Sequence, residues 1–252
     1  MPLIESPQND MFRKILSLTF ARGLKKEGLF LLSGKKLIAE FLRDPNLKIM
    51  YEVTAPGMKA VAVLSSDHPA AKEIQLSSEL FAQIDVLGTH YNILVLEQPV
   101  MADLKEADLL TYKPRGIEVV MPIGDPGNLG ALIRSCEAFG VPRVILAQEA
   151  AHPFLPKSVK ASAGSVLRLP LIHGPALNMF PDTCLALDMD GVSIDDFTWP
   201  KDGLLIVGEE GPGFDDGGTF KKFKNRIRIP TQNVESLNVV VAASIALAHK
   251  AR

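Results

Sequence analysis

The feature that most constrains this 252-residue chain is the stretch 204–248, in which two short apolar runs each end in a polar turn. The first run, 204–207, has the length and branching of a buried strand and leads into GEEGPG at 208–213. The second run, 227–229, leads through a polar loop into an apolar helix over 237–248. Ligands of open α/β sheets bind beyond the carboxyl ends of strands, so the two turns predict a binding site.

Three glycines in the first turn, Gly208, Gly211 and Gly213, would let backbone N–H and C=O groups approach a ligand with no side chain between. Glycine-rich turns are also common as ordinary tight connections. Glycine content alone therefore leaves both interpretations open.

Three blocks of sequence carry further information because of their order. They are NLGALIR at 128–134, GEEGPG at 208–213 and, after Ile229-Pro230, ESLNVVVAA at 235–243. Together they resemble the motifs of SpoU-class (TrmH-type) RNA methyltransferases of the SPOUT superfamily. The resemblance implies a parallel α/β sheet with a deep trefoil knot, S-adenosylmethionine held in the knotted region, methyl transfer to a ribose 2′-hydroxyl, and a homodimer.

The same resemblance implies roles for individual residues. Arg134 would bind a phosphate beside the target ribose and help to activate the hydroxyl, and Glu210 would orient the turn that contains it. The full catalytic set is Arg134, Asn128, Glu210, Ser236 and Asn238, and the cofactor set is Gly208, Ile229 and Leu237. Lys160 and Ser162, in KSVKASAG, are secondary candidates, with a helix of small packing residues as the alternative. The chain departs from the family at Glu209, where Asn is frequent, and at 231–233, where Met-x-Gly is common.

The first block has a rival interpretation as a dinucleotide-binding loop, since a strand at 117–123 leads through glycines into a helix ending near 139. The glycine spacing is G-x-x-G-x-x-G and not G-x-G-x-x-G. Glu149 lies near the position of a ribose-binding acid. Arg134 has an ordinary interpretation too, as a helix arginine that extends into solvent.

The first hundred residues alternate between strand-like and helix-like segments. An amphipathic helix with Asn9 as its N-cap is expected first. The expected helices are 9–27, 34–42 and 78–84, and the expected strands are 29–32, 49–53, 60–64 and 91–96. This part resembles the small α/β substrate-binding domain, related to a ribosomal-protein RNA-binding fold, that many SpoU-class enzymes carry. It lacks a glycine expected near His90, and a plain packing domain is the alternative.

The expected organisation is therefore an RNA-binding domain over 1–100, a linker over 101–116 and a knotted methyltransferase domain over 117–252. In the last of these, further strands are expected at 143–148, 166–172 and 183–187, with a turn-rich segment over 188–200.

Composition restricts the binding partners and the cellular location that can be expected. The net charge of −2 does not indicate a nucleic-acid partner. If the protein binds nucleic acid, its positive charge must be concentrated locally. Residues 1–50 contain nine Lys/Arg against five Asp/Glu, and 221–228 contains five Lys/Arg; a solvated surface is the alternative for each. Cys136 and Cys184 are expected to be buried free thiols. No apolar run is long enough to cross a membrane, no secretory leader is expected at the N-terminus, and a cytoplasmic enzyme without metal is expected.

The predicted function is S-adenosylmethionine-dependent methylation of a ribose 2′-hydroxyl, with ribosomal RNA favoured over transfer RNA because of the N-terminal domain. A transfer-RNA methyltransferase, a non-catalytic RNA-binding protein that retains the fold, and a nicotinamide-dependent oxidoreductase are the alternatives.

Overall fold

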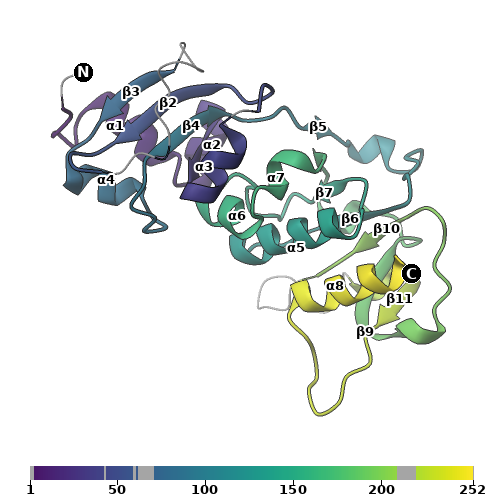
Figure 1. Ribbon diagram of the computed structural model, residues 1–252. Helices are drawn as coiled ribbons and strands as arrows, with labels where there is room; N and C mark the ends of the chain where they lie inside the picture. The colour runs from purple at the N-terminus through teal and green to yellow at the C-terminus, as the bar shows by residue number, and fades with distance from the viewer. Residues whose placement is uncertain (1–2, 43, 59–60, 62–70, 209–219, 252) are drawn as a thin grey trace. The chain divides into compact units, whose positions relative to one another are not determined.

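The computed structural model describes residues 3–42, 44–58, 61, 71–208 and 220–251, and the chain divides into two compact units (Figure 1). Unit 1 comprises Met1–Val100 together with His152–Gly164. Unit 2 comprises Met101–Ala151 together with Ser165–Arg252. Both combine helices with a sheet, which confirms the predicted α/β class.

Unit 1 is built on a four-stranded sheet in the order β1-β4-β2-β3. Its central strands alternate in direction, and only the β2–β3 pair is parallel. The strands are β1 (Leu29–Ser33), β2 (Ile49–Thr54), β3 (Lys72–Gln75) and β4 (Ile93–Glu97). Strand β3 was not predicted, because Ile74 is its one buried residue and leaves no apolar pattern. Most of the predicted strand 60–64 lies outside the described residues.

The predicted helix over 9–27 is wrong in one respect, since two helices occupy this stretch. Asn9 caps the first as expected, accepting hydrogen bonds from the backbone N–H groups of Met11 and Phe12. The helix ends where the hydroxyl of Ser17 turns back to the Lys14 carbonyl, at 2.7 Å. Gly23 then packs on the Ser17 backbone so closely that a Cβ would lie 2.0 Å from its carbonyl oxygen. The helices of unit 1 before residue 100 are α1 (Asp10–Ser17), α2 (Ala21–Glu27), α3 (Lys35–Phe41) and α4 (Ser78–Ile84).

A later segment of the chain completes unit 1. Helix α6 (Pro156–Ala161) packs on β1, and the ring of Phe154 lies 5.0 Å from the ring of Phe30, centroid to centroid. Both rings are fully buried. Part of the core of unit 1 therefore comes from a segment more than a hundred residues away in sequence.

Unit 2 contains a seven-stranded sheet in which every pair is parallel, in the order β11-β9-β10-β6-β7-β8-β5. The strands are β5 (Ala102–Asp103), β6 (Ile117–Met121), β7 (Val144–Leu146), β8 (Leu171–His173), β9 (Leu185–Ser193), β10 (Gly203–Ile206) and β11 (Asn225–Arg228). From β6 the chain proceeds through α5 (Pro126–Ala138) to β7 on one side, whereas β10 leads to the opposite edge. The order of strands thus reverses between β6 and β10.

Two predictions within unit 2 need correction. The expected strand 166–172 begins instead as the helix α7 (Ser165–Arg168), whose Arg168 binds the Glu137 carboxylate of α5 at 2.7 Å. The segment expected to be turn-rich from 188 instead continues β9 to Ser193. Its register on β11 shifts there, and Arg226 binds the bulged Asp188 at 3.2 Å.

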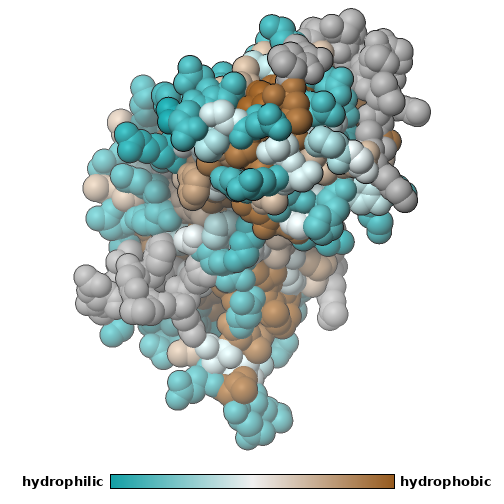
Figure 2. Space-filling model, turned by 90° about the vertical axis from the view of Figure 1, so that its left-hand side faces the viewer, coloured by the Kyte–Doolittle hydropathy of each residue, from teal (hydrophilic) through white to brown (hydrophobic). Residues whose placement is uncertain are grey.

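The remaining elements are 3₁₀ turns and the C-terminal helix. They are the 3₁₀ turns η1 (Glu106–Asp108), η2 (Leu177–Met179), η3 (Ile194–Asp196) and η4 (Phe220–Lys222), and the C-terminal helix α8 (Val239–Lys250). No helix in the described part of the chain is long and apolar enough to cross a membrane. Figure 2 shows one face of the molecule, on which hydrophilic side chains predominate and apolar ones appear between them.

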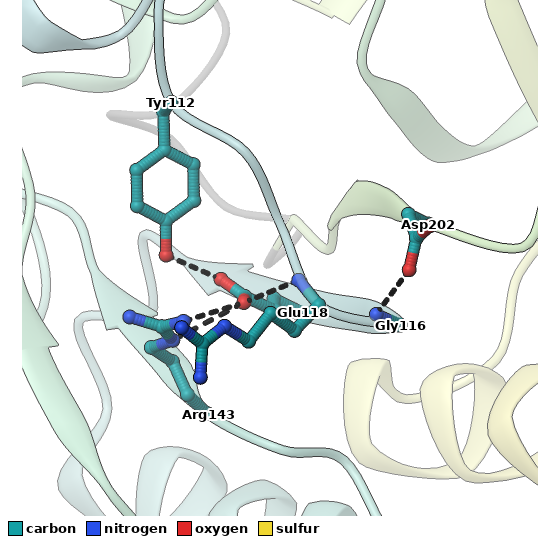
Figure 3. A network of polar contacts seen from close by, with 6 residues as sticks. Tyr112, Gly116, Glu118, Arg143 and Asp202 are labelled. Atoms are coloured by element: carbon teal, nitrogen blue, oxygen red, sulfur yellow. Dashed lines mark hydrogen bonds and ion pairs between the residues drawn. The ribbon is translucent and has the colours of Figure 1, made fainter.

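A buried polar network holds the amino end of β6 (Figure 3). The Glu118 carboxylate is fully buried and accepts hydrogen bonds from the Tyr112 hydroxyl at 2.5 Å, the Arg115 backbone N–H at 2.9 Å and Arg143 Nε at 3.1 Å. The Arg143 guanidinium also lies 5.6 Å from the centre of the Tyr112 ring. These contacts compensate the cost of burying the charge of Glu118.

We expect this network to make unit 2 sensitive to alkaline pH. Burial, and then the neighbouring Glu118 carboxylate, raise the pKa of Tyr112 well above its ordinary value of 10.0. A pKa raised by folding contributes stability below the pKa of the unfolded chain, which is lost as the pH rises beyond that value. At pH 8, the free energy of unfolding of wild type should exceed that of Tyr112→Phe by about 1 kcal/mol, the usual net contribution of one hydrogen bond. In urea unfolding, the difference should shrink above pH ~10; a constant difference would contradict the assignment.

Candidate functional site

The candidate site lies at the carboxyl edge of the sheet in unit 2, where the strand order reverses between β6 and β10. Such a switch point opens a crevice beyond the strand ends in parallel α/β sheets. Strand β6 leads into α5 there, and β10 leads to Gly208, which is half-buried. The next parallel strands, β9 and β11, end at the same edge.

The start of α5 is fixed by its own sequence. Asp125 is the N-cap and accepts a hydrogen bond from the Asn128 backbone N–H at 2.8 Å, and Pro126 occupies the first turn. Asp-Pro at a helix start is a common signature, because the proline has no N–H to leave unpaired. Asp125 was not among the predicted site residues, although this signature was present in the sequence. It sets the position of Asn128 in the first turn.

The start of α8 meets the start of α5. Asn238 is the N-cap of α8, with its side-chain oxygen accepting from the Val240 N–H at 2.9 Å. Its Nδ2 donates to Oδ1 of Asn128 at 3.4 Å, a long hydrogen bond. Two candidate residues 110 positions apart in sequence are therefore in contact.

Arg134 lies two turns into α5 and is exposed. Among the described residues, no side chain forms an ion pair or hydrogen bond with its guanidinium. By contrast, the arginines Arg143, Arg168 and Arg226 of the same unit bind carboxylates. Arg134 is thus available to an anion from outside the chain.

The other candidate residues lie outside α5 and α8. Ile229, Ser236 and Leu237 are half-buried in the segment between β11 and α8. Glu210 lies outside the described residues. Ser162 is buried in unit 1 and donates to the Val159 carbonyl at 2.9 Å, which accounts for its hydroxyl locally.

One alternative interpretation loses its support, and part of the basic segment is paired with carboxylates. The Glu149 carboxylate, which matched the position of a ribose-binding acid, accepts from the Leu177 N–H at 2.9 and 3.2 Å. It therefore binds the first backbone N–H of η2. In the basic segment 221–228, Lys224 binds Asp182 at 2.6 Å and Arg226 binds Asp188, so two of its five cations are paired with carboxylates. Lys222 donates to the Asn178 carbonyl at 2.6 Å, and burial lowers its pKa.

The cysteines are free and buried, as expected. Burial raises the pKa of Cys136 well above its usual range and that of Cys184 to about 11, so both remain thiols at neutral pH. Within the ranges that the structure describes, no three His, Cys, Asp or Glu side chains are grouped to hold a metal ion.

This chain is similar to known proteins over part or nearly all of its length. Residues 117–248 match the family model described as the SpoU rRNA Methylase family. A 23S rRNA (guanosine(2553)-2′-O)-methyltransferase, RlmP, of Bacillus subtilis is 27% identical over 99% of both chains. A protein of Syntrophobacter fumaroxidans called ribosomal RNA small subunit methyltransferase G 2 is 38% identical over 97% of this chain. The chain spans only 48% of that relative's length.

Solved structures share the fold. The SpoU methyltransferase AviRb from Streptomyces viridochromogenes, in complex with the cofactor AdoMet, superposes with a TM-score of 0.78 at 21% identity over 97% of each chain. An RNA methyltransferase of the TrmH family from Porphyromonas gingivalis gives a TM-score of 0.72 at 23% identity, over 97% of this chain and 98% of that one.

Proposed function

This chain belongs to the SpoU rRNA methylase family, and we propose that it transfers a methyl group from S-adenosylmethionine to a ribose 2′-hydroxyl of ribosomal RNA. The observation that carries the proposal is the contact between Asn128 and Asn238. Residues from the first and the last of the three sequence blocks meet at the switch point of the sheet, beside an arginine that no described side chain engages.

The residues at this edge suit the cofactor. S-adenosylmethionine needs apolar walls and backbone polar groups for its adenine. Gly208 offers backbone without a side chain, and Ile229 and Leu237 offer half-buried apolar surface. We assign cofactor binding to these three residues. When bound, S-adenosylmethionine would supply a methyl group activated by its sulfonium, and the S–C bond would break to leave a neutral thioether.

The protein's own residues then act on the RNA. A ribose hydroxyl is a poor nucleophile and must lose its proton as the new O–C bond forms. Arg134 is too basic to accept this proton. It binds the adjacent phosphate and stabilises the negative charge that develops on the oxygen, while phosphate or solvent takes the proton. Asn128, Ser236 and Asn238 position the ribose and Arg134, and this positioning of the reacting hydroxyl supplies much of the rate. We assign Glu210 to orienting the turn that contains it.

Ribosomal RNA is the favoured substrate because the full-length relative from B. subtilis is named for 23S rRNA. The S. fumaroxidans protein is named for the small subunit, but half of its length lies outside the match. Its name does not decide between the subunits. A ribosomal substrate also supports a cytoplasmic location.

The proposal is tested with RNA from cells that lack the gene. This RNA is incubated with the protein and isotopically labelled S-adenosylmethionine, digested, and analysed by mass spectrometry. Label on a ribose 2′-oxygen of a ribosomal fragment is expected. Label on transfer RNA would correct the substrate, and RNA binding without any transfer would favour a non-catalytic RNA-binding protein.

We also propose that unit 1 binds the RNA. Lys14 and Lys26 bind Glu27, and Lys48 binds Glu97. Within residues 3–42, five further cations pair with no described side chain, and they are Arg13, Arg22, Lys25, Lys35 and Lys36. Unpaired cations on a nucleic-acid-binding protein are available to phosphates.

Replacing Arg22, Lys25, Lys35 and Lys36 with glutamine should weaken binding of a ribosomal RNA fragment about tenfold or more. The slope of log K against log salt should fall by roughly 0.7–0.9 for each phosphate that the protein no longer neutralises. Fluorescence anisotropy at several salt concentrations measures both quantities. The matched control, Lys14→Gln with Lys48→Gln, removes cations that already bind carboxylates. Equal effects of the two sets would contradict the proposal.

A homodimer is part of the proposal and is supported by α8. Val241 and Ile245 lie one turn apart and are 47% and 40% exposed, whereas Val239, Ala243 and Leu247 of the same helix are buried. An exposed apolar stripe on a largely covered helix suits a second copy of the chain. We expect a dimer in light scattering and a monomer for Val241→Lys with Ile245→Lys. The control Val86→Lys, at an exposed apolar residue of unit 1, should remain dimeric.

The trefoil knot belongs to the same proposal. The pairing of β11 with β9, beyond β10 in the sheet, supports a crossing of the chain between β10 and β11. An experimental structure that traces residues 209–219 would test it.

A further inference from the structure

Two serine hydroxyls join α5 and α8. Oγ of Ser244 lies 2.8 Å from Oγ of Ser135 and 2.6 Å from the carbonyl oxygen of Val240, one turn earlier in α8. A hydroxyl carries one proton, and a carbonyl can only accept. Two oxygens at 2.6 Å repel unless a proton lies between them, so Ser244 donates to Val240. The remaining proton of the pair then requires that Ser135 donate to Ser244.

This pair stands in a fixed relation to the contact between Asn128 and Asn238. Ser135 follows Asn128 by seven residues in α5, and Ser244 follows Asn238 by six in α8. At 1.5 Å per residue, the two contacts are about 10 Å apart along either helix. The helices therefore run side by side in the same direction (Figure 1), with polar contacts two turns apart. Asn128 and Ser135, seven residues apart, lie on one face of α5, and Asn238 precedes α8 as its N-cap.

Beyond the contact of Asn238 with Asn128 at the helix starts, this pair is the polar contact that the described residues provide between α8 and α5. Every side chain of α8 before His249 is apolar except that of Ser244. Apolar burial is non-directional, whereas a displacement by one residue, 1.5 Å, breaks a hydroxyl contact of 2.8 Å. A single polar residue in an apolar helix interface is known to specify register in this way.

We propose that Ser135 and Ser244 are positioning residues for methyl transfer. Their hydroxyl pair sets the register of α8 on α5, so that Asn238 meets Asn128 and Arg134, the neighbour of Ser135, is held at the same edge. Neither serine touches the substrate. This inference rests on the proposed function, and its test separates the two.

The kinetic test uses Ser135→Ala, Ser244→Ala and the double variant, assayed well below their unfolding midpoints. We expect kcat to fall about five- to tenfold in each, with KM for S-adenosylmethionine within twofold of wild type. The double variant should be no slower than the slower single variant, because both substitutions remove one interaction. Ser244→Thr keeps the hydroxyl and should restore kcat. The control Ser17→Ala removes a comparable helix hydroxyl bond in unit 1 and should leave kcat unchanged.

A second measurement does not depend on activity. In ¹⁵N spectra, the side-chain amide signals of Asn128 and Asn238, assigned with the Asn→Asp variants, should shift in Ser244→Ala and return in Ser244→Thr. Unchanged amide signals would overturn the proposal. It would also be overturned if the serine variants had a lower unfolding midpoint but wild-type kcat, or if the losses of kcat in the two single variants added in the double variant. If wild type transfers no methyl group at all, the proposed function fails, while the amide signals still report whether the serines position the asparagines.

Discussion

Arg134→Ala is expected to lower methyl transfer by a factor of about 10² to 10³, the usual effect of removing one group that stabilises developing negative charge. The affinity for S-adenosylmethionine should stay within about twofold, because the cofactor is assigned to other residues. The fold should survive, since no described side chain depends on this guanidinium. Label incorporation measures the first quantity and calorimetry the second.

Two further variants sharpen this prediction. Arg134→Lys keeps the charge but loses the planar fork of donors, so it should recover only part of the activity. Arg168→Ala is the matched control, because that arginine also lies in unit 2 but binds Glu137. Its activity should be near wild type. Full activity of Arg134→Ala would remove this residue from the mechanism.

Glu118→Ala is expected to lower the free energy of unfolding of unit 2 by about 3–5 kcal/mol, the cost of removing one partner from a buried ion pair. The substitution leaves the Arg143 guanidinium, the Tyr112 hydroxyl and the Arg115 N–H without their common acceptor. The fluorescence of Trp199, the single tryptophan of the chain, follows the unfolding of this unit in urea.

The control is a second Glu–Arg pair in the same unit. Glu137 binds Arg168, but its side chain is 32% exposed, against 0% for that of Glu118. Exposed pairs contribute about 1 kcal/mol or less, so Glu137→Ala should be nearly silent. Similar losses for both variants would show that burial does not decide the strength of the Glu118 network.

Much of the architecture could be predicted from local patterns. The apolar runs at 117–123 and 204–207 contain buried strands, Asn9 caps a helix, and the glycine-rich stretch after 123 leads into α5. Each of these depends on residues close together in sequence. The helix α7 and the bulge of β9 had no such local signal, and their charged residues Arg168 and Asp188 meet Glu137 and Arg226 from distant segments.

The residues of the candidate site also fall into those that the sequence identified and those that it did not. The sequence blocks identified Asn128 and Asn238, and the structure brings these two into contact. The hydroxyl pair of Ser135 and Ser244 had no sequence signal, because a serine in a helix carries no information until the facing helix is known. The pairing of Arg226 and Lys224 had no sequence signal either, since their carboxylate partners lie 38 and 42 residues earlier in the chain.

The segment that completes unit 1 has a consequence for the order in which the chain can fold during synthesis. Phe30 is made early, yet the ring that covers it belongs to Phe154, which follows after the whole of β6, α5 and β7. A growing chain shorter than 152 residues therefore presents β1 without α6. Contacts of such long separation slow folding and leave apolar surface open in the meantime. Unit 1 therefore cannot complete its hydrophobic core as an independent N-terminal module before the first half of unit 2 has been synthesised.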